Sequence, residues 1–263
     1  MTKFAVTHPG KIGDALYTLP TIKYLYELSG NKVDFYTSHY CRPIKELFEY
    51  QSCINKVIIS EGYVVERMDM GCQPIYIPTP DGEYDTVLHL GFRSVPDKRL
   101  DWFMAESVGI EPYKLPQVSY EFPDFKYLDL GNSYHITLAS RGETSYKDLF
   151  LDLITHTGPA QHRKPIVQIG SREEFIGNLY ISNNFNMTGL NLLETCYILS
   201  KASIFIGLMS SQLVLANGFP DLIKIVPHDG KSWDMRHVLY SDNHKYLVNP
   251  TLTEILNIID KKD

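Results

Sequence analysis

A stretch near the amino terminus brings together groups that could carry out acid–base chemistry. Residues 8–20 read HPGKIGDALYTLP and place His8, Lys11 and Asp14 in one glycine-containing turn between an apolar run and a helical pattern. A carboxylate held in such a turn can take a proton from a hydroxyl group. The alternative is architectural: the glycines would allow a tight corner, and Asp14 would only cap the helix that follows.

Two later loops carry basic side chains that could bind phosphate. Residues 139–147, ASRGETSYK, stand directly before a predicted helix, whose free N–H groups and positive dipole end suit an anion. Arg141 and Lys147 would add charge-assisted hydrogen bonds. Residues 227–237, PHDGKSWDMRH, form a second cationic loop. The alternative for residues 139–147 is a capped helix with a solvated face, and the alternative for residues 227–237 is an exposed connection.

No familiar nucleotide or metal signature accompanies these loops. The sequence lacks the P-loop pattern GxxxxGK[ST], the dinucleotide fingerprint GxGxxG, and the hydrolase patterns HExxH and GxSxG. It also lacks Asp-x-Asp, so a metal held by paired carboxylates against a nucleotide diphosphate is unsupported. We therefore expect chemistry that needs no metal and no bound cofactor.

Composition narrows the class of protein further. The 263 residues favour two domains at about 150 residues each, and the net charge of −6 disfavours a general polyanion binder. The four cysteines show no metal-binding spacing, so we expect free thiols in a reducing compartment. With no signal-peptide pattern and no apolar run of about 18 residues, we expect a cytoplasmic protein without stable membrane insertion.

Short apolar runs alternate with helical patterns along the chain, which predicts an α/β protein with parallel sheets. The proline-rich residues 110–133 interrupt the alternation and are the best candidate linker. We therefore expect two Rossmann-like domains facing a central cleft, at residues 1–131 and 132–250, followed by a terminal helix in residues 251–263. The predicted strands are 3–7, 33–37, 57–59, 86–90, 134–138, 165–169, 203–206 and 222–226. The predicted helices are 15–28 (kinked or restarted at Pro20), one from about 43, and 98–109, 145–157, 172–180, 191–201, 210–217 and 252–261.

The motifs resemble those of the heptosyltransferase-like enzymes of glycosyltransferase family 9, which have the two-domain GT-B fold. Residues 13–22, GDALYTLPTI, match the family's opening GD-x-L-x-T-L-P-x-I pattern, and residues 84–94 echo its yDlvidl…rs segment. Residues 188–207 and 210–220 resemble the stretch before the donor loop and the helix after it. The resemblance covers nearly the whole chain and implies an α/β, GT-B architecture.

The resemblance also implies a mechanism. Asp14 would be the general base of an inverting, metal-independent transfer from a nucleotide-sugar donor to an acceptor hydroxyl. We expect it to stay ionised, because a helix start favours the charged form. The donor and phosphate contacts are assigned to Ser140, Arg141, Thr144, Lys147, Ser210, Ser211, Gln212, His228 and Lys231. The acceptor side is assigned to His8, Lys11, Gly13 and Arg93.

The donor loop departs from the family pattern. Gly207, Leu208 and Met209 stand where the family has Asp-(Ser/Thr)-Gly, and Gln212 replaces a histidine. Because the missing aspartate and histidine usually help to hold the donor, ADP-heptose is not fixed as the donor of this chain.

Several functions remain open on the sequence alone. The acceptor could be a sugar, a lipopolysaccharide core or a modified DNA base. The chain could instead be a non-catalytic module that binds a nucleotide sugar, or a GT-B-like sugar-nucleotide epimerase or hydrolase.

Overall fold

In the part of the chain that the computed structural model describes, all strand pairs are parallel and the strands form two sheets. The structure describes residues 2–61, 77–92, 96, 98–130, 135–139, 146–156, 165–176, 184–229 and 243–261. Within these residues, contacts define two compact units, one ending at Phe122 and the other beginning at Pro123. The predicted boundary at 131/132 therefore lies nine residues beyond this division.

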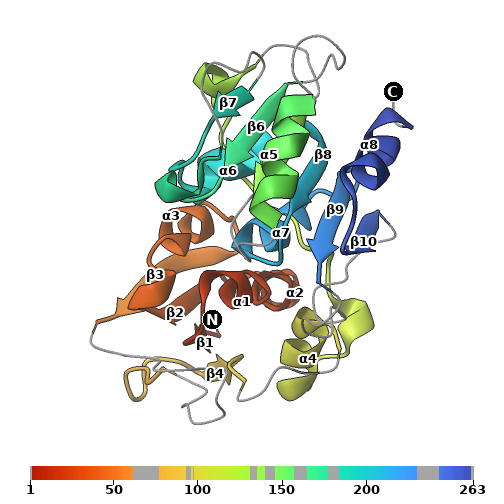
Figure 1. Ribbon diagram of the computed structural model, residues 1–263. Coiled ribbons are helices and arrows are strands. Elements are labelled where there is room, and N and C mark those ends of the chain that lie inside the picture. Colours follow the sequence, from red (N-terminus) through yellow and green to blue (C-terminus); the bar gives the residue numbers. More distant parts are fainter. Residues whose placement is uncertain are drawn as a thin grey trace. The chain divides into compact units, whose positions relative to one another are not determined.

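The first unit contains a four-stranded sheet in the order β3-β2-β1-β4 (Figure 1). Its strands are β1 (Phe4–His8), β2 (Val33–Ser38), β3 (Ile54–Ser60) and β4 (Thr86–His89). Its helices are α1 (Ile12–Leu16), α2 (Leu19–Ser29), α3 (Ile44–Glu49) and α4 (Leu100–Ser107).

The second unit contains a six-stranded sheet in the order β7-β6-β5-β8-β9-β10. Its strands are β5 (His135–Ala139), β6 (Ile166–Ile169), β7 (Asn184–Asn186), β8 (Ala202–Gly207), β9 (Ile223–His228) and β10 (His244–Val248). Its helices are α5 (Lys147–His156), α6 (Leu192–Lys201), α7 (Ser211–Ala216) and α8 (Leu252–Asp260). If β5 is counted as the first strand of this unit, the order becomes 3-2-1-4-5-6, which is the strand order of a Rossmann fold.

The helix predicted over residues 15–28 is two helices, as the proline in its pattern allowed. Helix α1 ends at Leu16, and α2 restarts with Thr18 as its N-cap and Pro20 in its first turn. Proline is tolerated there because the first N–H groups of a helix have no intrahelical partner. The Thr18 hydroxyl does not cap α2, since it donates instead to the Ala15 carbonyl at 2.7 Å.

Three features of the second unit differ from the prediction. Strands β7 and β10 were not expected, because β7 has only three residues and two are asparagine, while β10 is a half-exposed edge strand. The helix predicted over 172–180 is wrong for its described part, which forms only a 3₁₀ turn at Arg172–Glu174. The side chain of Gln168 accepts from the Ile176 N–H and donates to its carbonyl, which takes these groups away from a helix.

The first part of the predicted linker is fastened to the first unit. Lys23 donates to the Ser119 carbonyl at 2.7 Å, and the Gln51 amide exchanges two hydrogen bonds with the backbone of Glu121. The carboxylate of Glu121 in turn accepts from the backbone and hydroxyl of Ser52. Side chains of α2 and of the residues after α3 therefore hold this segment in place.

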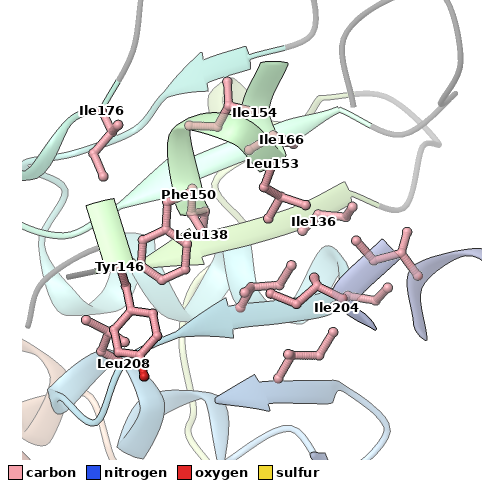
Figure 2. Packing of buried hydrophobic residues seen from close by; sticks show 14 residues of the cluster. Ile136, Leu138, Tyr146, Phe150, Leu153, Ile154, Ile166, Ile176, Ile204 and Leu208 are labelled. Atoms are coloured by element: carbon pink, nitrogen blue, oxygen red, sulfur yellow. The ribbon is translucent and has the colours of Figure 1, made fainter. Parts of the chain in front are cut away.

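The second unit has a continuous apolar core between its sheet and the pair α5 and α8. Figure 2 shows Tyr146 and Phe150 directed toward the sheet, where Leu138 and Ile204 lie. Ile255 and Ile259 of α8 belong to the same buried cluster. The terminal helix, which the sequence treats as a separate segment, is thus part of the core of the second unit.

Truncating Ile255 tests this placement of α8. The side chain is fully buried, so Ile255→Ala should lower the free energy of unfolding by about 2–4 kcal/mol through lost apolar burial and a residual cavity. Chemical denaturation monitored by circular dichroism measures the change. The exposed neighbour Thr253 provides the control, since Thr253→Ala should leave stability nearly unchanged.

Candidate active site

The described candidate residues lie at the carboxyl ends of the strands or in the segments that directly follow them. In open parallel sheets, ligands bind at this edge, at the point where the strand order reverses. That switch point lies between β1 and β4 in the first unit and between β5 and β8 in the second. The turn with Asp14 follows β1, and the segment with Ser210 follows β8.

Side chains of the first unit meet across its own switch point. His8 at the end of β1 stacks on Phe92, which follows β4, with ring centroids 6.1 Å apart. His8 is fully buried, and Phe92 is nearly so. The predicted acceptor-side role of His8 would therefore need this packing to open.

At the switch point of the second unit, the two facing residues are among the smallest, alanine and glycine. Gly207 ends β8 beside Ala139, which ends β5. A Cβ on Gly207 would lie 3.0 Å from the Ala139 carbonyl oxygen and 2.7 Å from the Phe205 ring. A larger residue at position 207, where the family pattern has an aspartate, would therefore force Phe205 and Ala139 to move.

Asp14 lies inside the first helix and is not its N-cap. The N-cap is Lys11, whose side chain makes no capping bond, and Asp14 is the third helical residue. The charge and the backbone N–H of Lys11 both act to lower the pKa of its carboxyl. The architectural alternative expects Asp14 as the helix cap, whereas the structure places it at the third helical position.

Burial sets the acidity of Asp14. Loss of solvation raises the pKa of its carboxyl from 3.8 to about 6, against the lowering effects of the Lys11 charge and the Lys11 N–H. The expectation that the helix start favours the charged form left out desolvation, which is the largest influence on this carboxyl. A carboxylate with this pKa is largely ionised at neutral pH and is a stronger base than an exposed aspartate.

The described residues of the second unit present hydroxyl, amide and imidazole groups after β8 and β9. The Ser210 hydroxyl at the start of α7 is buried and has no hydrogen-bond partner, and Ser211 donates to Gln212 at 3.1 Å. His228 ends β9, and its ring contacts that of Tyr246, with centroids 6.5 Å apart. The sequence-predicted set of Ser210, Ser211, Gln212 and His228 thus follows two neighbouring strands.

Two residues at this edge were missed by sequence reasoning. Asn249, just after β10, donates its backbone N–H to the His228 carbonyl at 2.7 Å and its side-chain amide to the Asp229 carbonyl at 3.3 Å. Tyr146, just before α5, donates to the Asn249 side chain at 3.4 Å. Asn249 has a positive φ of 43°, which asparagine tolerates better than most residues. Sequence reasoning missed these contacts because it did not predict β10, which pairs with β9 and places Asn249 beside His228.

The remaining predicted site residues fall outside the described part of the chain. These are Arg93, Ser140, Arg141, Thr144 and Lys231; Lys147 begins α5, but its side chain is not described. Lys11 is exposed and Gly13 half-buried in the turn of the first unit. Among the residues that are described, no group of acidic, histidine and cysteine side chains could hold a metal ion, and no helix could cross a membrane.

Solved structures share this fold over the full chain. E. coli ADP-heptose lipopolysaccharide heptosyltransferase II superposes with a TM-score of 0.66 and 12% identity, covering 99% of this chain and 98% of that one. The chain has the heptosyltransferase fold. A family 9 glycosyltransferase from Veillonella parvula matches with a TM-score of 0.66 and 12% identity, over 100% and 89% of the two chains.

A third heptosyltransferase-fold structure contains a ligand. E. coli heptosyltransferase WaaC with ADP-2-deoxy-2-fluoro heptose matches with a TM-score of 0.65 and 11% identity, over 100% of both chains. These structural matches confirm the GT-B architecture expected from the sequence. No protein-family model and no curated protein matches the sequence.

Replacing Asp14 should stabilise the protein at alkaline pH. Because the folded-state pKa is raised, the native protein binds a proton more tightly than the unfolded chain, and stability is lost as pH rises through 6. Asp14→Asn cannot ionise, so it should gain about 2 kcal/mol at pH 8 and nothing near pH 4. Denaturant titrations at both pH values measure this difference. A loss of stability at pH 8 would contradict it.

His8 should make the fold sensitive to acid. Burial lowers the pKa of its imidazole from 6.5 to about 3, so the unfolded chain binds the proton first and stability falls as pH drops below 6.5. His8→Phe keeps the ring stacked on Phe92 and should lose about 3 kcal/mol less than the wild type between pH 7 and pH 4. Thermal unfolding across this range provides the measurement, and parallel pH curves would exclude the effect.

Proposed function

We propose that the protein is an inverting, metal-independent glycosyltransferase that moves a sugar from a nucleotide-sugar donor to an acceptor hydroxyl. The observation that carries the proposal is the Asp14 carboxylate, which lies in the first turn of α1, shortly after β1, and has its pKa raised to about 6 by burial. The heptosyltransferase fold supports the reaction class. In this proposal Asp14 is the general base.

The transfer needs a base that accepts the proton of the acceptor hydroxyl and groups that stabilise the negative charge on the departing diphosphate. Asp14 would take the proton of the acceptor hydroxyl while that oxygen attacks the anomeric carbon from the face opposite the nucleotide. The bond to the nucleoside diphosphate then breaks, and the diphosphate leaves with the bonding electrons. This single displacement inverts the anomeric centre and leaves Asp14 protonated.

The donor is proposed to bind to the second unit. In the first unit the switch point is occupied by the rings of His8 and Phe92. In the second unit it is bordered by Ala139 and Gly207, and the buried Ser210 hydroxyl has no partner. The E. coli structure with ADP-2-deoxy-2-fluoro heptose supports a nucleotide sugar as the donor class.

Positive charge on the second unit would stabilise the departing diphosphate. Arg141, Lys147 and Lys231 lie in the two cationic loops of its sequence, and charge-assisted hydrogen bonds to phosphate oxygens can replace a metal ion. Glycine at 207 and glutamine at 212 replace an aspartate and a histidine of the family pattern, which leaves the sugar and the nucleotide base of the donor to experiment.

The acceptor is proposed to be a sugar hydroxyl, as in a lipopolysaccharide core. A modified DNA base is less favoured, because affinity for DNA depends on positive charge and this chain has a net charge of −6. Salt-sensitive binding of duplex DNA would reverse this order.

Kinetics of Asp14→Asn test the proposed base. After thermal-shift screening of ADP, UDP, GDP and CMP sugars identifies a donor, kcat/KM of the wild type should rise with pH with a midpoint near 6. Asp14→Asn should lower kcat by at least about 100-fold and abolish this dependence. Product anomers are identified by NMR.

An exposed aspartate provides the matched control. Asp81 lies on the surface, and Asp81→Asn should keep the wild-type rate. Wild-type turnover by Asp14→Asn would refute the base assignment. Donor binding without turnover for any acceptor would identify a non-catalytic binding module, and an altered sugar without transfer would identify an epimerase.

A further inference from the structure

One asparagine at the carboxyl edge of the second sheet contacts two other segments of that edge. Asn249 directly follows β10, and its backbone N–H donates to the carbonyl of His228, the last residue of β9, at 2.7 Å. Its side-chain amide donates to the next carbonyl, that of Asp229, at 3.3 Å. Its side-chain oxygen accepts from the Tyr146 hydroxyl, just before α5, at 3.4 Å. The side chain of Asn249 therefore links the segment after β9 to the start of α5.

The backbone of Asn249 adopts a conformation that is rare for residues with a side chain. Its φ of 43° lies in the left-handed region, and within the described ranges it is the only non-glycine residue with a positive φ. Asparagine enters this region more readily than most residues, but at an energetic cost. Such conformations persist where surrounding contacts hold them. The three hydrogen bonds of Asn249 provide these contacts at the end of β10.

The Tyr146 end of this link is fixed in the core of the second unit. Tyr146 is 6% exposed and belongs to the buried cluster that contains Phe150 of α5. Figure 2 shows its hydroxyl directed away from Phe150. At the other end of the link, His228 and Asp229 are only half-buried. Asn249 thus ties a partly exposed segment beside the proposed donor site to a buried ring.

We propose that Asn249 is a positioning residue for the donor, acting through the backbone of His228 and Asp229. Its side chain does not touch the donor in this proposal. It holds the segment after β9 against the fixed Tyr146 ring, so that the His228 side chain, a predicted donor contact, keeps one position. The effect on the donor rests on the proposed function, whereas the link itself does not.

The expected effect depends on how often the segment after β9 is in place. Without the side chain of Asn249, the Asp229 carbonyl loses one donor and the Tyr146 hydroxyl loses one acceptor. The segment then visits other conformations, and the apparent affinity for a donor falls with the fraction of molecules that stay competent to bind. Loss of one such hydrogen bond corresponds to about a 3–10-fold change in this equilibrium.

Amide hydrogen exchange tests the link without any ligand. The Asn249 N–H donates to the His228 carbonyl, so its exchange rate in the full-length protein, measured by ¹⁵N NMR, reports how often this contact opens. Asn249→Gly removes the side chain and keeps the positive φ at little cost. Tyr146→Phe removes only the hydroxyl and keeps the ring. Both variants should speed exchange of this amide by about 3–10-fold after correction for intrinsic rates.

Nucleotide binding tests the positioning role. Titration calorimetry with ADP, UDP, GDP and CMP identifies which of them binds the wild type, and that nucleotide is the probe for the variants. Asn249→Gly should raise its Kd by about 3–10-fold, and Tyr146→Phe should act in the same direction. The double variant should lose less than the product of the two single losses, because both substitutions remove the same hydrogen bond. In transfer assays the donor KM should rise while the acceptor KM stays unchanged.

A second asparagine of the same strand provides the matched control. Asn243 lies just before β10, and its side-chain amide donates to the Pro220 carbonyl at 2.7 Å, at the amino end of the strand. Asn243→Gly removes a comparable hydrogen bond. It should leave both the exchange of the Asn249 amide and the affinity for the nucleotide unchanged.

The outcomes separate the link, the positioning role and the proposed function. Unchanged exchange of the Asn249 amide in both Asn249→Gly and Tyr146→Phe would overturn the link. Faster exchange with unchanged nucleotide affinity would overturn the positioning role, and so would an equal rise in donor and acceptor KM. If none of the four nucleotides binds the wild type and no transfer occurs, the proposed function fails and the donor role fails with it, while the exchange rates still decide the link.

Discussion

The chemistry proposed for this protein depends on how one carboxylate is balanced between burial and the neighbouring Lys11. Desolvation raises the pKa of Asp14, and the charge and backbone N–H of Lys11 lower it. An exposed aspartate would not be desolvated in this way. The chain passes tightly from β1 into α1, and the hydroxyl of Thr37 and the thiol of Cys41 donate to the carbonyls of His8 and Gly10 in this turn. The raised pKa of Asp14 is therefore a product of its surroundings rather than of the residue type alone.

The two sheets share a topology but treat their switch points differently. In the first, His8 and Phe92 fill the position with aromatic surface. In the second, Gly207 meets Ala139 with no room for a side chain. The same strand order thus carries aromatic packing at one switch point and closely packed small residues at the other.

Much of the fold could be predicted from periodicity, and the reasons for the failures are local. The strands rich in valine and isoleucine and the helix restart at Pro20 were recognisable because burial and proline leave clear patterns. Strand β10 was not, since an edge strand alternates weakly, and the predicted helix after Arg172 failed because Gln168 captures the Ile176 backbone. In the candidate site, Asp14 was identified by its motif, but its raised pKa depends on burial, which residue spacing cannot reveal.

The burial of Cys41 also bears on how sulfur behaves in this molecule. Burial raises the thiol pKa of Cys41 and Cys53 to about 12 and about 11, and that of Cys196 upward as well. Oxidants and alkylating reagents attack the thiolate, and these three described thiols stay protonated at neutral pH. The turn therefore contains a cysteine thiol, Cys41, in an environment that suppresses the usual reactivity of this group.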